Sequence, residues 1–150
     1  MTITFFGHRE ITDTEKIEEK LIGILKSIIK NEPCEFLFGG YGMFDALAYR
    51  CCKNFFDYSD KPQSKLVFVT PYITENFLET IGKYSFDDIV YPPIEKVPPK
   101  FAINARNKWM VEQADMIITC ISRKYGGAYS SYLYAKRRNK TVVNIGSLEN

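Results

Sequence analysis

The sequence has few of the features that mark membrane, secreted or strongly nucleic-acid-binding proteins. No apolar run approaches the roughly 20 residues that a membrane-spanning helix needs. The first residues, MTITFFGHRE, lack the basic start, long apolar stretch and small-residue exit of a signal peptide. The formal net charge is only +2, which is too small to indicate nucleic-acid binding from bulk charge. These absences predict a cytoplasmic globular protein that has no membrane partner.

Cysteine and histidine are also scarce. The cysteines are Cys34, Cys51, Cys52 and Cys120, and the only histidine is His8. Their spacing fits no zinc pattern, so the sequence predicts no metal site, and nothing in it calls for a cofactor. Cys34 and Cys120 lie in or beside apolar runs and are expected to act as small core residues. We expect Cys51 and Cys52, adjacent in a predicted helix, to be reduced and structural.

What the sequence does have is an alternation of short apolar runs with helical patterns over its 150 residues, a length typical of one domain. Strands are predicted at Thr2–Gly7, Glu35–Phe38, Lys65–Thr70, Asp87–Tyr91, Asp115–Ser122 and Lys140–Ile145. Helices are predicted from a capping box at Thr12 and Glu15 to Asn31, and at Met43–Phe56, Ile73–Tyr84, Lys100–Ala114 and Ala128–Asn139. This order predicts a single doubly wound, Rossmann-like α/β domain, with five to six mostly parallel strands and helices on both faces.

One segment is predicted to have no regular structure. Tyr91–Pro99 (YPPIEKVPP) holds four prolines in nine residues. Proline fixes its own φ angle and has no N–H group, so we expect a stiff, extended loop here. Whether this loop closes over a ligand as a lid is left open.

The glycines after the second strand are the first candidate functional feature. Ligands of open parallel sheets bind outside the carboxyl ends of the strands. Gly39, Gly40 and Gly42 stand at such an end and lead into a helix, where exposed N–H groups favour an anion such as phosphate. The alternative is a tight turn without a ligand. Asp45, in the first turn of that helix, either stabilises the helix or binds ribose hydroxyls.

Two further segments follow strands at the same predicted edge of the sheet. Arginine offers a forked donor that suits phosphate, and histidine can donate to an oxygen, stack on a ring or have a purely structural role. Three tyrosines in or beside the glycine loops, Tyr41, Tyr125 and Tyr129, could each stack on a base. The two segments are Gly7, His8 and Arg9 after the first strand, and Gly126 and Gly127, with Ser130, after the fifth.

The predicted helix Lys100–Ala114 carries polar residues on its apolar side. Ile103, Met110 and Ala114 define a stripe that we expect to be buried, and Arg106 and Asn107 fall on the same side. Charged groups rarely face inward unless they have partners. Arg106 therefore either caps a neighbouring strand end or pairs with an acid, or it faces the ligand crevice together with Asn107.

Taken together, several segments resemble the SLOG superfamily in their order along the chain. They are FFGHR, GGYGMFDALA, ARNKWMVEQADMIITCIS and YGGAYSSYLYAKRRNKTVVNI. SLOG names the Rossmann-like domains of the DNA-processing protein DprA and of the LOG phosphoribohydrolases. The sequence is most similar to the small stand-alone bacterial and phage branch that includes YpsA. The resemblance covers nearly the whole chain except residues 55–64 and 72–100.

The resemblance implies a pocket for a nucleotide or nucleotide derivative, but it leaves catalysis open. The hydrolytic LOG branch has a PGGxGTxxE signature whose glutamate acts in N-glycosidic bond cleavage. Aligned on Gly126 and Gly127, the threonine position holds Ser130 and the glutamate position holds Leu133. Glu112 or Asp45 as a substitute is not supported by spacing. The residues of the implied pocket are Gly7, His8, Arg9, Gly39, Gly40, Gly42, Asp45, Arg106, Asn107, Gly126, Gly127 and Ser130.

Three functions are therefore considered. The first is a nucleotide-binding sensor or sequestering module, of the kind that the resemblance links with bacterial nucleotide signalling and phage conflict. The second is an enzyme acting on N-glycosidic bonds, either a nucleotide hydrolase or a deoxyribosyltransferase-like protein. The third is single-stranded DNA binding, against which stand the small net charge and a basic cluster confined to Lys136–Lys140. A homo-oligomer is also expected, and Trp109 belongs either to the core or to an interface.

Overall fold

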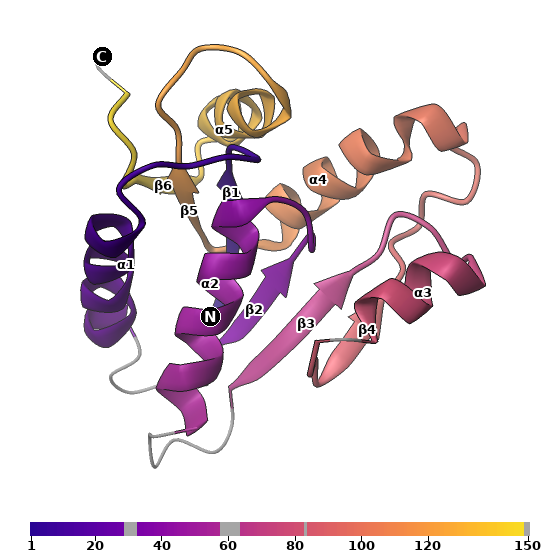
Figure 1. Cartoon of the computed structure of the whole chain (residues 1–150). Helices are drawn as coiled ribbons and strands as arrows, with labels where there is room; N and C mark the ends of the chain where they lie inside the picture. Colours follow the sequence, from indigo (N-terminus) through magenta and orange to yellow (C-terminus); the bar gives the residue numbers. More distant parts are fainter. Residues whose placement is uncertain (29–32, 58–63, 83, 149–150) are drawn as a thin grey trace.

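The centre of the protein is a six-stranded sheet in the order β4-β3-β2-β1-β5-β6. The computed structural model describes residues 1–28, 33–57, 64–82 and 84–148 (Figure 1). All five neighbouring pairs of strands are parallel, which confirms the doubly wound α/β fold predicted from the sequence. The strands are β1 (Thr2–Gly7), β2 (Glu35–Phe38), β3 (Lys65–Val69), β4 (Asp88–Val90), β5 (Met116–Cys120) and β6 (Thr141–Asn144).

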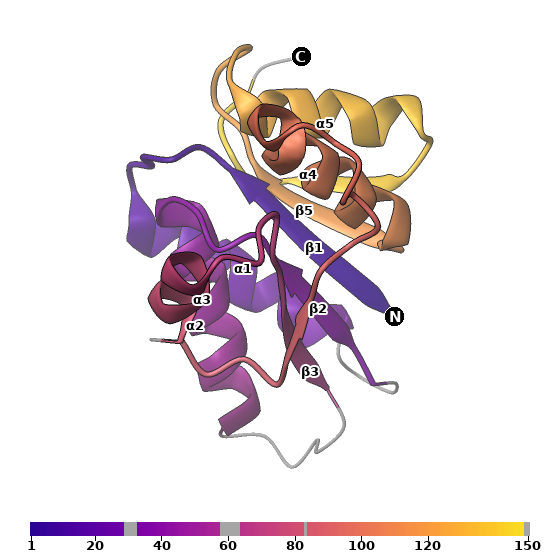
Figure 2. The ribbon, with the colours of Figure 1, turned by 90° about the vertical axis from the view of Figure 1, so that its right-hand side faces the viewer.

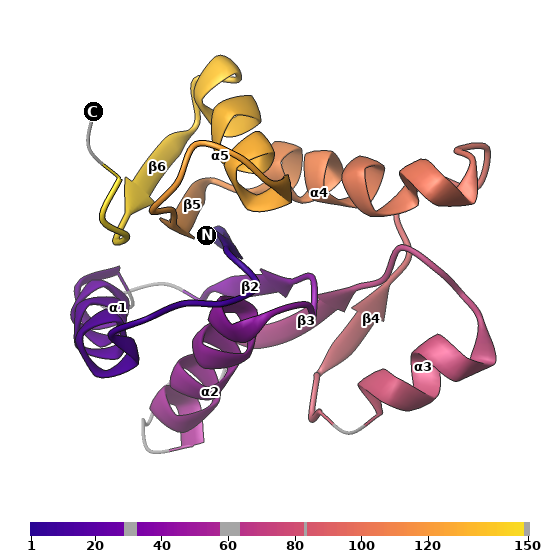
Figure 3. The same cartoon turned by 45° about the horizontal axis from the view of Figure 1, so that its top comes forward.

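The helices cover both faces of the sheet. Figure 3 shows one group on one side of the strands and a second group on the other. The first group is α1 (Thr14–Ile28), α2 (Met43–Asp57) and α3 (Glu75–Ile81); the second is α4 (Ala102–Gln113), preceded by the 3₁₀ turn η1 (Pro99–Phe101), and α5 (Gly127–Arg137). None of the helices in the part of the chain that the structure describes is long and apolar enough to span a membrane.

Strand β1 supplies side chains to the cores on both faces because successive residues of a strand point in opposite directions. Ile3 and Phe5 pack among residues of α1 and α2, whereas Phe6 packs with Met110 of α4 and Ala135 of α5. Each large apolar side chain that is fully buried stabilises the fold by about 1.5–3 kcal/mol. The central strand therefore holds the two helix layers together.

All four cysteines lie buried in the core between the sheet and the layer of α1 and α2, as free thiols. Burial raises the pKa of Cys51 and of Cys120 to about 11. These two thiols are therefore protonated at neutral pH. The expectation that Cys34 and Cys120 act as small core residues is confirmed, and the reduced state of Cys51 and Cys52 stays a prediction.

The path of the chain reverses beside β1. The chain runs outward from β1 through β2 and β3 to β4, and then returns to place β5 on the opposite side of β1. Figure 2 shows β1 running away from the N-terminus between the two helix layers. In doubly wound sheets, this switch point is where the connections diverge and leave a crevice at the carboxyl ends of the strands.

Two local predictions were wrong. Helix α1 begins at Thr14, and the N–H of Ile17 donates to the carbonyl of Asp13 at 3.1 Å, so Asp13 rather than Thr12 precedes the helix. Asp13 has a φ angle of 53°, a left-handed conformation that aspartate tolerates and that turns the chain into the helix. The predicted helix end near Asn31 lies outside the described residues.

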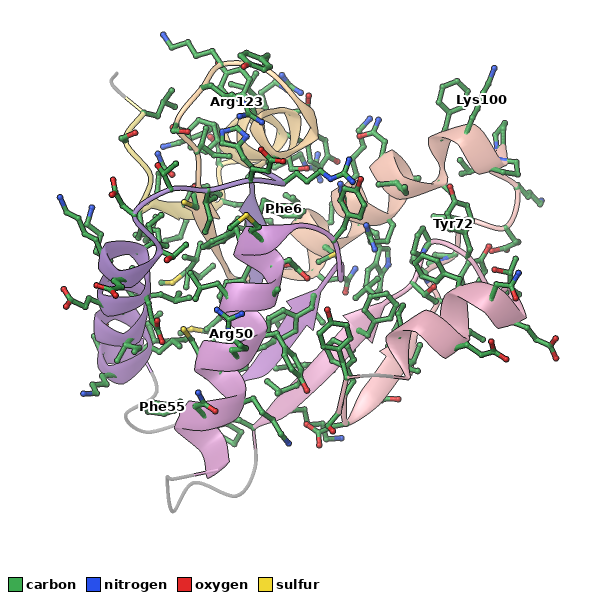
Figure 4. The ribbon with its side chains drawn as sticks, in the orientation of Figure 1. Phe6, Arg50, Phe55, Tyr72, Lys100 and Arg123 are labelled. Carbon is green, nitrogen blue, oxygen red and sulfur yellow. The ribbon has the colours of Figure 1, made fainter. Side chains whose placement is uncertain are left out.

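The second wrong prediction concerns Ile103, which was expected in the buried stripe of its helix but is 48% exposed. The buried side of α4 runs through Ala102, Arg106 and Met110, and Ile103 lies one residue on from Ala102, about 100° around the helix. The proline-rich segment is irregular, as predicted, and its end is fixed by the Tyr72 hydroxyl, which donates to the carbonyl of Pro99 at 2.9 Å (Figure 4).

Candidate functional site

A cavity of about 250 Å³ lies at the carboxyl ends of β1 and β2, beside the loop that follows β5. We call it the switch-point cavity because it spans the boundary between β1 and β5. Of the twelve residues predicted for the pocket, the structure brings eight together here: Gly7, His8, Arg9, Gly39, Arg106, Asn107, Gly126 and Gly127. The other predicted residues, Gly40, Gly42, Asp45 and Ser130, do not line it.

Arg106 is buried at the floor of this cavity and also has a structural task. Its Nη1 donates to the carbonyl of Gly39 at 3.0 Å and to that of Val69 at 2.8 Å, at the ends of β2 and β3. Its Nε donates to Oδ1 of Asn107 at 2.9 Å, which orients the guanidinium. Burial lowers the pKa of Arg106 to about 10, so it remains a cation at neutral pH. Arg106 therefore caps two strand ends and presents positive charge to the cavity.

His8 ties the end of β1 to the loop after β5. Its Nε2 accepts hydrogen bonds from the main-chain N–H groups of Ser122 at 3.1 Å and Arg123 at 3.3 Å. Burial, together with the nearby Arg123 guanidinium, lowers the pKa of His8. A nitrogen that accepts must carry no proton, so the neutral ring is protonated on Nδ1. His8 therefore holds the two sides of the switch point together as a neutral acceptor.

The glycine loop before α2 uses its N–H groups within the protein. The N–H of Gly40 donates to Oδ2 of Asp45 at 2.6 Å, and that of Met43 donates to the carbonyl of Arg9 at 2.8 Å. Burial raises the pKa of Asp45 to about 6, and the Gly40 N–H and the Arg106 guanidinium oppose this rise. Gly40, Gly42 and Asp45 line a separate small hollow instead. Asp45 thus takes the place that an anionic ligand was expected to occupy in this loop.

The glycine pair before α5 is arranged differently. Gly126 has a φ angle of 97°, which favours glycine, and its carbonyl accepts from the N–H and the hydroxyl of Ser130. A Cβ atom added to Gly127 would meet no atom within 4 Å. No side chain caps the helix, so the N–H groups of residues 127–129 have no acceptor within the described part of the chain. This helix start faces the cavity with open main-chain donors.

Arg123 is a cavity residue that the sequence reasoning missed. It lies on the loop between β5 and α5 (Figure 4), and its guanidinium carbon is 5.0 Å from the centre of the Tyr125 ring. Its Nε is buried, and no hydrogen-bond acceptor for it exists among the residues that the structure describes. The position of Arg123, three residues after the end of β5, matches the rule that selected Arg9. The rule that functional residues follow strands could therefore have identified Arg123 from the sequence.

Aromatic rings stand at the mouth of the cavity. Tyr41 is 64% exposed, and the guanidinium carbon of Arg9 lies 5.2 Å from its ring centre. Tyr125, 66% exposed, forms the similar pair with Arg123. Tyr41 and the half-exposed Ile103 line the cavity directly. The rim therefore offers flat apolar surface beside positive charge.

No carboxylate lines the switch-point cavity in the described part of the chain. Leu133 is half-buried on α5 and does not line the cavity, and Glu112 accepts a hydrogen bond from the Tyr134 hydroxyl at the far end of α4. The described residues also contain no cluster of three or more His, Cys, Asp or Glu that could hold a metal ion. Within the described residues, the cavity thus combines three arginines and main-chain N–H groups with no carboxylate in its lining.

Comparison with known proteins gives matches at the level of structure. No family model and no curated protein matches the sequence. DNA processing protein A (DprA) from Helicobacter pylori matches with a TM-score of 0.60 and 18% identity over 96% of this chain, and DprA from Streptococcus pneumoniae with 0.67 and 16% over 95%. The structural-genomics target TM1055 matches with a TM-score of 0.58 and 11% identity over 94% of this chain and 71% of its own.

The matching region is only part of the DprA proteins. This chain covers 64% of the Helicobacter chain and 49% of the Streptococcus chain. At these levels of identity, the comparison concerns the fold alone. The chain has a Rossmann-like fold that is similar to the folds of DprA and TM1055.

Proposed function

We propose that this protein binds a nucleotide or a nucleotide derivative in the switch-point cavity, as a sensor or sequestering module. The observation that carries the proposal is the convergence of three arginines, Arg9, Arg106 and Arg123, on a cavity that no described carboxylate lines. A guanidinium pairs with phosphate through two parallel N–H donors. The open N–H groups at the start of α5 add donors on the same side.

The rim supports an aromatic base as the other part of the ligand. Tyr41 is largely exposed, and Arg9 lies over its ring, so a base could stack on this pair next to a phosphate held inside. An inorganic anion alone would not need such a surface. A nucleotide satisfies both the charged interior and the aromatic rim.

The proposal also includes the expected branch of the superfamily, location, oligomeric state and biological role. We assign the chain to the small stand-alone, YpsA-like branch of the SLOG superfamily, because its motifs follow that order and its fold is shared with DprA. We also propose a cytoplasmic location, a homo-oligomeric state and a place in bacterial or phage nucleotide signalling. The oligomeric state is checked by light scattering, and a purely monomeric protein at working concentration would exclude it.

Thermal unfolding with a panel of nucleoside monophosphates and NAD tests the proposal, since a ligand that binds only the folded state raises Tm. We expect at least one member of the panel to raise Tm in the wild-type protein and not in an Arg123→Ala variant. A panel that leaves the wild-type Tm unchanged would contradict the proposal. Chromatography of the same mixtures for released base separates binding from N-glycosidic cleavage, and we expect no release.

Single-stranded DNA binding is a second candidate, favoured by one observation from the comparisons. The structure of Helicobacter pylori DprA was described for its mode of binding single-stranded DNA, and this chain shares its fold. Exposed Tyr41 and Tyr125, each beside an arginine, could stack on successive bases. In the basic cluster, however, Lys140 donates to the carbonyls of Glu112 and Ala114 and so has a structural role.

Oligonucleotide binding measured against salt concentration tests this second candidate. Contacts to several phosphates would give a steep decrease in affinity with salt. No binding at low salt would exclude it. Binding that is lost in both Tyr41→Ala and Tyr125→Ala variants would favour it over a mononucleotide site.

A further inference from the structure

A second cavity lies on the other side of Arg123 and has no part in the function proposed so far. It has a volume of about 230 Å³ and lies between α1 and the carboxyl ends of β5 and β6. We call it the α1 cavity. Lys16 and Lys20 of α1 line it together with Arg123, and Glu10 and Asp13 lie on the loop that leads into the helix.

The cations of the α1 cavity are only partly balanced by the carboxylates that line it. Neither lysine, nor Arg123, forms an ion pair with a carboxylate among the residues that the structure describes. Glu10 and Asp13 reduce the positive charge of the cavity, but three cations against two carboxylates leave an excess of positive charge. Because like charges that face one cavity repel, an anion placed between them would be stabilised.

Arg123 joins the two cavities. It is the one residue that lines both the switch-point cavity and the α1 cavity, within the described part of the chain. Its buried Nε has no acceptor there, so a donor is available at the boundary. A ligand that passes over this edge of the sheet would meet Arg123 between its two ends.

The volumes allow one ligand to occupy both cavities. Sites for drug-sized molecules usually measure roughly 300–1,000 Å³. The switch-point cavity, at about 250 Å³, and the α1 cavity, at about 230 Å³, each fall below this range, but together they lie within it. Two half-sites that share a wall are the arrangement expected for an elongated ligand.

We propose that the ligand carries two phosphate groups separated by at least one sugar, with one phosphate in each cavity and Arg123 between them. This inference rests on the proposed function, because the switch-point cavity supplies the first phosphate site. The chemical class is a short nucleotide with separated phosphates, such as a 5′-phosphorylated dinucleotide, in contrast to a nucleoside mono- or diphosphate. Lys16 and Lys20 provide the contacts to the second phosphate.

Isothermal titration calorimetry with two probes tests the inference. ADP carries adjoining phosphates, and 5′-phosphorylated diadenylate carries separated ones; the uridine counterparts are titrated in parallel. We expect the dinucleotide to bind the wild-type protein at least about tenfold more tightly than the diphosphate, as expected for new charge-assisted contacts. A Lys16→Ala/Lys20→Ala variant should lose most of this difference and bind the diphosphate as the wild type does.

The matched control is Lys26→Ala, which removes an exposed lysine from the last turn of the same helix, outside the α1 cavity. Its affinities for both probes should equal those of the wild type, and Tm without ligand should show that every variant is folded. If the diphosphate binds but the double variant keeps the full preference for the dinucleotide, this inference alone is overturned. If neither the diphosphate nor the dinucleotide binds, with adenine or with uracil as the base, the proposed function fails and the inference fails with it.

Discussion

Asp45 accepts a hydrogen bond from the main-chain N–H of Gly40, with 2.6 Å between Oδ2 and N. This contact distinguishes two glycine loops that look alike in the sequence. Before α2, the carboxylate of Asp45 accepts a hydrogen bond from the main chain of the loop. Before α5, no side chain among the described residues caps the helix, and the donors stay open. The second loop is therefore the better place for a phosphate, and the following predictions depend on this difference.

Alanine substitutions should separate the two loops. Gly127→Ala adds a methyl group where no atom lies within 4 Å, so we expect a gain of about 0.4–1 kcal/mol in the free energy of unfolding. The same methyl group would stand in front of the open N–H groups and weaken nucleotide binding about tenfold. Urea unfolding and a nucleotide titration measure the two effects. Undiminished affinity would place the ligand elsewhere.

Gly40→Ala should have the opposite profile. Gly40 has a φ angle of 72°, and an added Cβ would lie 2.4 Å from Cε2 of Phe68. Left-handed backbone and overpacking together should lower the free energy of unfolding by at least about 1–2 kcal/mol. A variant as stable as the wild type in urea would mean that the loop can take another path.

Asp45→Asn should change how stability depends on pH. The folded protein raises the pKa of Asp45 from 3.8 to about 6, so between these values it holds a proton that the unfolded chain releases. The contribution of Asp45 to the stability of the wild type therefore falls as pH rises through this range. Asparagine keeps an acceptor for the Gly40 N–H but does not titrate. As pH rises through this range, the free energy of unfolding of the variant should increase by on the order of 2 kcal/mol relative to that of the wild type. A difference in urea midpoints that stays constant with pH would contradict this.

His8→Gln should change the pH dependence of stability in the opposite direction. The folded protein lowers the pKa of His8 below 6.5, so as pH falls below 6.5 the unfolded chain gains a proton that the native ring resists. The contribution of His8 to wild-type stability should therefore decrease with acidification, while glutamine offers an oxygen to the N–H groups of Ser122 and Arg123 without titrating. Urea midpoints of both proteins, compared from neutral pH downward, check this. Parallel curves would show that His8 does not titrate in this way.

Arg106→Met should destabilise the protein. The substitution leaves the carbonyls of Gly39 and Val69 without their buried donor, but it also removes the cost of burying a cation. We expect a net decrease of about 2 kcal/mol in the free energy of unfolding. Lys108→Met, an equal charge loss on the exposed side of the same helix, serves as the control in urea unfolding. Equal effects of the two substitutions would refute the capping role.

The fold could be predicted almost completely because its signals are local. The apolar runs Thr2–Gly7 and Glu35–Phe38 are strands with the predicted bounds, and the uninterrupted apolar character of Asp115–Ser122 reflects a strand covered on both faces. The start of α1 was misplaced because the left-handed φ angle of Asp13 is not visible in the pattern. Such a backbone conformation depends on how the loop packs.

The site was predicted in position but not in detail. The rule that functional residues follow strands placed Arg9, Gly39 and Gly127 at one edge, where the structure has the switch-point cavity. The sequence could not show that some glycines serve packing. A Cβ on Gly7 would lie 2.3 Å from Cδ1 of Phe44, a contact between β1 and α2 that arises only in three dimensions. The occupation of the α2 loop by Asp45 was hidden for the same reason.

The position of β5 next to β1 also matters for the newly made chain. The walls of the switch-point cavity come from residues near the start of the chain, such as Gly7 and Gly39, and from residues as late as Ala128. A ribosome that has translated only as far as the proline-rich segment has produced β1 to β4 without the opposite wall. Formation of this cavity therefore has to wait for the last third of the polypeptide, and a message cut short before α5 yields a product without it.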